Sequence, residues 1–74
     1  MNSGELRFTA RQRQIVRLIA EGLTAREIGE RTGLAARTAK HHADVLREKL
    51  GVERRRDVPA AYYEATGTYP WPRD

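Results

Sequence analysis

Apolar residues recur at helical spacing along most of the chain, and glycines separate the segments that carry them. Ile15, Val16, Leu18 and Ile19 form one apolar stripe, because residues three and four apart lie on the same face of a helix. No stretch alternates apolar and polar residues, as a strand with one solvated face does. The pattern therefore predicts an all-α fold, a compact four-helix domain with helices at about residues 9–21, 24–32, 36–50 and 57–66.

Residues that begin and end helices stand at the limits of these segments. Thr9 with Gln12, and Thr24 with Glu27, have the spacing of a capping box, in which two side chains bond the free amides of the first turn. Asp57 is expected to cap the fourth helix, with a proline tolerated in its first turn. A glycine follows each predicted helix, as expected where the chain turns through left-handed backbone.

The two ends of the chain differ from this pattern. Residues 1–7 are predicted to be a flexible arm, and the helical domain takes up residues 8–67. Residues 68–74 hold prolines and aromatic residues that cannot continue a helix, so an extended tail is expected. Three alternatives stay open for this tail: it docks on the helices, it recruits a partner, or it is disordered.

The second and third predicted helices are joined by a tight turn that contains Gly33, which is the arrangement of a helix-turn-helix. At about 100° per residue, the apolar residues of the third helix share one side and polar residues take the other. The polar face consists of Arg37, Lys40, His41 and Asp44. Gly29 and the alanines at 39 and 43 allow the two helices to approach closely. The core is expected to come mainly from Leu18, Ile19, Leu23, Ile28, Leu34, Leu46 and Leu50.

Positive charge is concentrated around this polar face. The chain has a net charge of +4, and residues 37–56 alone carry seven basic and three acidic side chains. Such a concentration is expected of a surface that binds an anion such as nucleic acid, although a solvated helix surface is the alternative. The Arg54-Arg55-Arg56 run is interpreted as a clamp on phosphates, with an ordinary basic linker as its alternative.

The residue types on the polar face suit the reading of base edges. Arg37 and Lys40 can donate to the O6 and N7 acceptors of guanine, and Asp44 can accept from the amino group of cytosine. Asp44 would also repel phosphates, which makes it discordant on a DNA-binding face. Thr38 and the first amides of the helix could hold a phosphate. His41 is expected either to contact DNA or to be solvated.

Other kinds of site are not indicated by the sequence. His42 is expected to pack and to bond the backbone, with DNA contact as the alternative. A metal site on the two adjacent histidines is not expected, since their side chains diverge by about 100°. No cofactor is expected, and the chain lacks the motifs of an enzyme. With no cysteine and no apolar run of membrane-spanning length, a cytoplasmic protein is expected.

Residues 8–56 resemble the LuxR-type helix-turn-helix domain, also called the GerE or FixJ type. The resemblance rests on Phe8-Thr9-Ala10-Arg11, Leu18-Ile19-Ala20-Glu21-Gly22, Arg26-Glu27-Ile28-Gly29-Glu30-Arg31, Thr38-Ala39-Lys40-His41-His42 and Lys49-Leu50-Gly51-Val52 with Arg55. It implies that the third helix reads DNA, with Lys40, His41 and Asp44 toward bases. It also implies that Thr38, Lys49 and Arg55 contact phosphate or buttress the interface. The chain departs from the family in having Ala35 where a capping serine is usual.

The resemblance further implies a homodimer formed through the fourth helix, for which Ala61, Tyr62 and Ala65 are the expected contacts. Tyr62 could instead lie in the core. The family often carries a receiver or ligand-binding domain, for which this chain has no room, so it resembles the stand-alone members. The function expected is that of a bacterial transcription regulator that binds double-stranded DNA in the nucleoid. The alternative is an adaptor that binds RNA polymerase or another protein through the helix-turn-helix or the aromatic tail.

Overall fold

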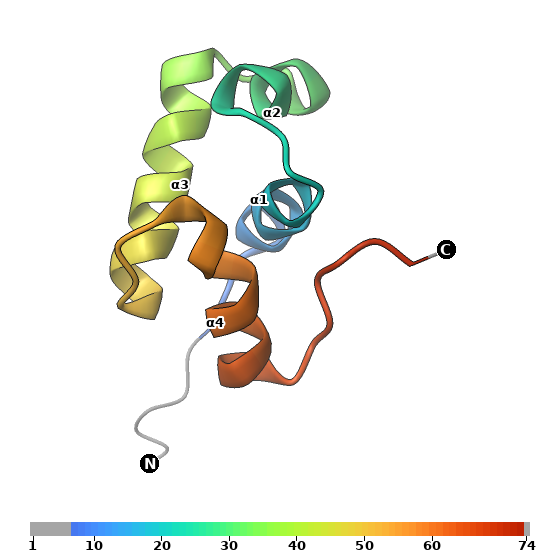
Figure 1. The fold of residues 1–74 in the computed structure, drawn as a ribbon. Coiled ribbons are helices and arrows are strands. Elements are labelled where there is room, and N and C mark those ends of the chain that lie inside the picture. The colour runs from blue at the N-terminus through green and yellow to red at the C-terminus, as the bar shows by residue number, and fades with distance from the viewer. Residues whose placement is uncertain (1–6, 74) are drawn as a thin grey trace.

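The computed structural model describes residues 7–73, which form helices and no strand (Figure 1). The elements are α1 (Ala10–Ala20), α2 (Ala25–Thr32), α3 (Ala36–Leu50), a short 3₁₀ helix η1 (Arg55–Asp57) and α4 (Val58–Thr66). Every helix begins and ends within one residue of its predicted position, so the all-α prediction is confirmed. Apart from Arg7, the predicted arm lies outside the described residues. Within residues 7–73, no helix has the length and apolar character needed to cross a membrane.

Both predicted capping boxes are formed. The Thr9 hydroxyl accepts from the Gln12 amide at 3.0 Å, and the Gln12 side chain accepts from the Thr9 amide at 2.9 Å. Thr24 and Glu27 make the same pair of bonds at 3.1 and 2.8 Å. The bond donated by the Thr24 amide holds the pKa of Glu27 below its ordinary value of 4.5. The first two helices therefore begin where local sequence directs them to begin.

The other two helices begin without a side-chain cap. Ala35 stands at the N-cap of α3 with extended backbone. It provides no capping bond, because its methyl group cannot accept a hydrogen bond. Asp57 does not cap α4, contrary to the prediction. Its backbone is already helical, at φ −87° and ψ −7°, because the chain enters α4 through η1. A capping side chain needs extended backbone to reach the amides of the first turn.

The core lies between α1 and the other three helices. Its buried residues are Ile15, Val16, Leu18, Ile19, Ile28, Ala39, Ala43, Leu46, Val58 and Tyr62. Leu23, Leu34 and Leu50 were predicted to be main core residues but are only partly buried. Ile15 and Val16 of α1, and Val58 and Tyr62 of α4, are buried in the core instead. α4 therefore forms part of the core.

α2 and α3 meet at a glycine. Gly29 is buried on α2, and a Cβ atom added to it would lie 2.5 Å from the carbonyl oxygen of Leu34. The Gly33 and Leu34 amides both donate to the Gly29 carbonyl, at 2.8 and 3.0 Å. Gly33 itself has φ +78°, which residues with side chains rarely adopt. Ala39 is fully buried on the facing side of α3. These small residues fix the angle at which α3 leaves the turn.

The tail docks on the helical body, which is the first of the three alternatives. It leaves the end of α4, turns back next to that helix and then runs outward to the C-terminus (Figure 1). Pro70 is buried, and Tyr69 and Trp71 contact each other and Tyr63 of α4 edge to face, with ring centroids 4.9–5.9 Å apart. Edge-to-face contacts of this kind stabilise aromatic clusters. The extended tail is thus held against α4 by aromatic packing.

Replacement of Gly29 by alanine should destabilise the domain. The new methyl group would be forced against the Leu34 carbonyl, at a cost of about 1–3 kcal/mol. Urea denaturation followed by circular dichroism measures the change. The control is Glu30→Ala, a neighbouring exposed position where the change should stay within about 0.5 kcal/mol. A Gly29→Ala variant as stable as the parent would show that α2 and α3 do not depend on this close approach.

Candidate nucleic-acid interface

The polar face of α3 is assembled as the sequence predicts. Arg37, Lys40 and His41 are exposed, while Thr38 and Asp44 are half-buried. Together these five residues line an open recess of about 330 Å³. The opposite side of the same helix is in the core, where Ala39, Ala43 and Leu46 are buried. The face therefore has a fixed direction, because the helix cannot rotate without exposing its apolar side.

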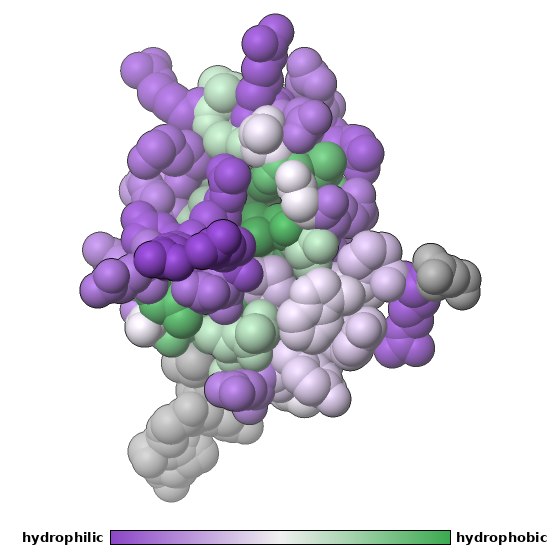
Figure 2. All heavy atoms as spheres, in the orientation of Figure 1, coloured by the Kyte–Doolittle hydropathy of each residue, from purple (hydrophilic) through white to green (hydrophobic). Residues whose placement is uncertain are grey.

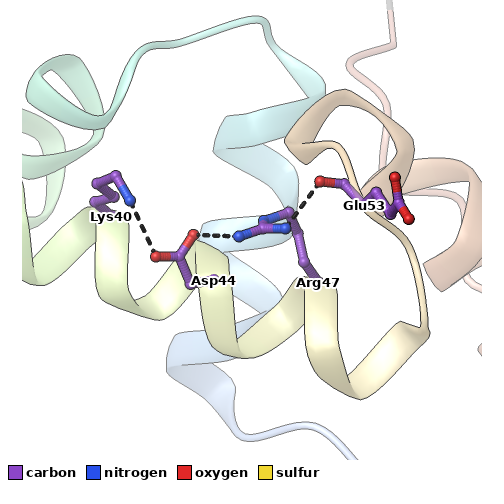
Figure 3. A network of polar contacts seen from close by, with 4 residues as sticks. All are labelled: Lys40, Asp44, Arg47 and Glu53. Carbon is purple, nitrogen blue, oxygen red and sulfur yellow. Dashed lines mark hydrogen bonds and ion pairs between the residues drawn. The ribbon is translucent and has the colours of Figure 1, made fainter.

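Asp44 is paired with a cation on either side along α3. Its Oδ2 accepts from Lys40 Nζ at 3.1 Å, and its Oδ1 accepts from Arg47 Nη2 at 2.8 Å (Figure 3). Arg47 Nη1 also donates to the backbone carbonyl of Glu53 at 2.8 Å. Arg47 is not among the contact residues predicted from the sequence. Its spacing of three residues from Asp44, with Lys40 four residues before, was the available signal.

These partners explain how an acidic residue stands on a basic face. The hydrogen bond from Arg47, followed by that from Lys40, lowers the pKa of Asp44 below its ordinary value of 3.8. Asp44 is therefore ionised at neutral pH, and its charge is balanced by two neighbouring cations. The three residues together carry one positive charge. The face is less repulsive to phosphate than a lone aspartate would make it.

The two histidines take different positions. His41 lies exposed on the polar face, while His42 is half-buried at its edge. Their ring centroids are 6.4 Å apart and the rings are tilted. The His42 side chain forms no hydrogen bond within residues 7–73, so the expected backbone bond is not made there. No group of three metal-ligating side chains occurs in that same part of the chain.

Lys49 joins the end of α3 to the segment before α1. Its ammonium group donates to the Arg7 carbonyl and lies 3.4 Å from Gln12 Oε1. It also lies 4.6 Å from the centroid of the Phe8 ring, in the geometry of a cation–π contact. These contacts hold the Lys49 ammonium group between the end of α3 and the segment before α1.

The three consecutive arginines lie in the connection between α3 and α4. Arg54, Arg55 and Arg56 are all exposed, and the last two belong to η1. None of them forms an ion pair with another described residue. The Arg47 bond to the Glu53 carbonyl ties the start of this connection to α3. The guanidinium groups are thus presented to solvent next to a segment anchored on the polar helix.

The α4 residues expected at a dimer interface do not share one environment. Ala65 is exposed and Ala61 is half-buried. The Tyr62 side chain is only 3 % exposed, and its ring packs edge-on against Phe8 at 5.0 Å between centroids. Tyr62 is therefore a core residue within the single chain. Its ring does not contribute to the exposed surface of α4.

A short helix (α2), a glycine turn and a second helix (α3) with one buried and one polar face define a helix-turn-helix domain. The chain belongs to the family of bacterial regulatory proteins of the luxR type (GerE), which it matches over residues 6–60. The family resemblance predicted from the sequence is thereby confirmed.

Two curated proteins are similar to this chain. One is the probable transcriptional regulatory protein SgaR of Hyphomicrobium methylovorum, which is 43 % identical over 48 residues, covering 65 % of this chain and 23 % of the relative. The other is the DNA-binding transcriptional activator DevR/DosR of Mycobacterium tuberculosis, also 43 % identical over 48 residues, covering 65 % of this chain and 22 % of the relative. The chain thus matches less than a quarter of the length of either relative. No solved structure gives a significant match.

The carboxyl group of Asp44 should titrate below pH 3.8 in the folded protein. Because folding lowers its pKa, the stabilising contribution of the pairing is present above the unfolded value and is lost as the pH falls through the folded value. Carbon-detected NMR of the Asp44 carboxyl group measures the titration. Arg47→Met should raise the pKa, and Arg17→Met on α1 should not. Titration at or above 3.8 in the parent would contradict the pairing.

Proposed function

We propose that this chain is the DNA-binding domain of a transcription regulator, and that α3 enters the major groove of double-stranded DNA. The observation that carries the proposal is the polar face of α3. Arg37, Lys40 and His41 are exposed together on it, while the other side of the helix is fixed in the core. Such a helix presents its N-terminal half to base edges in the helix-turn-helix geometry. Family membership supports the same role.

Binding is proposed to combine backbone docking with base reading. The exposed Arg54, Arg55 and Arg56 contact phosphates, and Thr38 adds a hydroxyl near the start of α3. Arg37 and Lys40 donate to acceptors on guanine, where arginine forms two parallel bonds. His41 is exposed on the same face and completes the proposed reading surface. Lys49 acts indirectly, since it holds α3 against the segment before α1.

A homodimer on a two-fold symmetric site is the proposed assembly. Ala61 and Ala65 lie on the accessible part of α4 and provide its contact surface. Two copies would then place two α3 helices in successive major grooves. The names of the two relatives, a transcriptional regulatory protein and a DNA-binding transcriptional activator, support a role in transcription. The proposed location is the nucleoid of a bacterial cytoplasm.

A second candidate function is the binding of a protein such as RNA polymerase. It is favoured by the exposed aromatic side chains of Tyr63 and Tyr69, which border a recess of about 520 Å³ together with Arg73. In Figure 2 the residues over α4 and the tail are pale, whereas strongly hydrophilic residues surround α2 and α3. In this view the surface over α4 and the tail differs in character from that around α2 and α3, so protein binding and DNA binding would use separate surfaces.

Selection of duplexes from a random pool, followed by gel-shift titration, tests the main proposal. Affinity should fall steeply between low and physiological salt, because each neutralised phosphate releases counterions. Arg37→Ala and Lys40→Ala should each weaken binding to the selected duplex by about 1–3 kcal/mol.

The matched control is Arg17→Ala, which removes an exposed arginine from α1 and should leave this binding nearly unchanged. Two results would reject the DNA-binding proposal: affinity that does not vary with salt, or reading-face variants that bind as well as the parent. In the second case, retained binding of a protein partner would favour the adaptor function.

A further inference from the structure

Lys40, a basic residue on the polar face of α3, is linked to the backbone through a series of side-chain contacts. Its ammonium group binds Asp44, Asp44 binds Arg47, and Arg47 binds the Glu53 carbonyl (Figure 3). The three links measure 3.1, 2.8 and 2.8 Å. The chain of contacts therefore runs from the polar face to the connection that carries the three arginines.

This arrangement differs from an isolated ion pair on a helix surface. The Arg26–Glu30 pair on α2 has the same spacing along a helix, but it measures 4.0 Å, and its side chains are 85 % and 71 % exposed. In the α3 network Arg47 is only 31 % exposed, and its guanidinium is held on two sides. An isolated exposed pair contributes little, because two long side chains must lose freedom to form it. Here Arg47 is already held by the Glu53 carbonyl, so its side chain loses less conformational freedom when it pairs with Asp44.

The network also limits what Asp44 can do on the reading face. Each of its carboxylate oxygens already accepts a hydrogen bond from a cation of the same helix. Each oxygen keeps a second lone pair, but a cytosine amino group would have to fit beside two donors that already hold the carboxylate. Its geometry suits the holding of Lys40 better than direct contact with a base.

We propose that Asp44 is a specificity-determining positioning residue, which Arg47 holds in place and which in turn sets where the Lys40 ammonium can reach. The proposal rests on the proposed DNA-binding function. A lysine is a flexible point charge with three rotatable donors, so an untethered Lys40 would bind any phosphate within reach. The negative partner lowers this attraction and directs the ammonium along the helix face. Non-specific affinity is lost, and discrimination between base pairs is gained.

Fluorescence anisotropy on the full chain tests the proposal. The probes are the duplex chosen by selection, the set of its single-base-pair variants, and a duplex of mixed sequence. Asp44→Asn keeps the shape of the side chain and removes its charge. It should tighten binding to the mixed duplex about twofold to fivefold, the range of an exposed ion pair. Discrimination at the base pair that Lys40 reads should fall by a similar factor, and Arg47→Met should lower it too.

A double-mutant cycle shows whether Asp44 acts through Lys40. Lys40→Met should abolish discrimination at the same base pair, and adding Asp44→Asn should cause no further loss. The control is Glu30→Gln, which breaks the α2 pair of equal spacing and should leave discrimination unchanged. Circular dichroism of each variant confirms that the helices are retained.

Three other outcomes would contradict the positioning role of Asp44. If Asp44→Asn still changes the preference at one base pair in the Lys40→Met background, Asp44 reads a base itself and the positioning role is wrong. If the parent selects a sequence but Asp44→Asn behaves as Glu30→Gln does, the tether has no role in specificity, while the DNA-binding function stands. If the parent shows no salt-dependent binding to any duplex, the DNA-binding function and the positioning role fail together.

Discussion

The absence of a side chain at Gly29 is the constraint on which the geometry of this domain depends. A methyl group there would lie 2.5 Å from the Leu34 carbonyl, closer than two non-bonded atoms can approach. Without it, α2 and α3 meet at the Gly33 turn, and the small buried residues of α3 complete the contact. The direction of α3, and with it the direction of its polar face, follows from this approach. A bulkier residue would move the whole polar face of α3.

Electrostatics on that surface is organised within the helix itself. Lys40, Asp44 and Arg47 are one turn apart, so α3 alone brings them into contact. Arg47 then extends the network to the Glu53 carbonyl and so to the connection between α3 and α4. The discordant aspartate is thus explained without reference to a partner. Its first effect is on its own neighbours, whichever molecule the face binds.

Local sequence rules predicted most of this fold, and contacts between distant segments account for the rest. Thr9 and Thr24 act within three residues of themselves, so their capping boxes could be read from spacing. The capping role of Asp57 was wrong because a 3₁₀ turn precedes it and makes its backbone helical. The burial of Tyr62 depends on Phe8. The hydrogen bond of Lys49 depends on Arg7, 42 residues away.

The polar face was predictable for a similar reason, since helical angles place Arg37, Lys40, His41 and Asp44 together. Angles do not tell which side chains pair, because Asp44 has basic residues both three and four positions away. The role of Arg47 therefore needed the structure. The docking of the tail also needed it, since aromatic rings near prolines are equally compatible with packing, partner binding and disorder.

Chemical-shift mapping of the isotopically labelled chain, titrated with a selected duplex, tests most directly whether α3 is the reading helix. The largest changes should fall on residues 37–44 and on Arg54, Arg55 and Arg56. The aromatic cluster of α4 and the tail, which consists of Tyr63, Tyr69 and Trp71, should change little. Changes centred on the aromatic residues, with the polar face of α3 unaffected, would contradict the assignment.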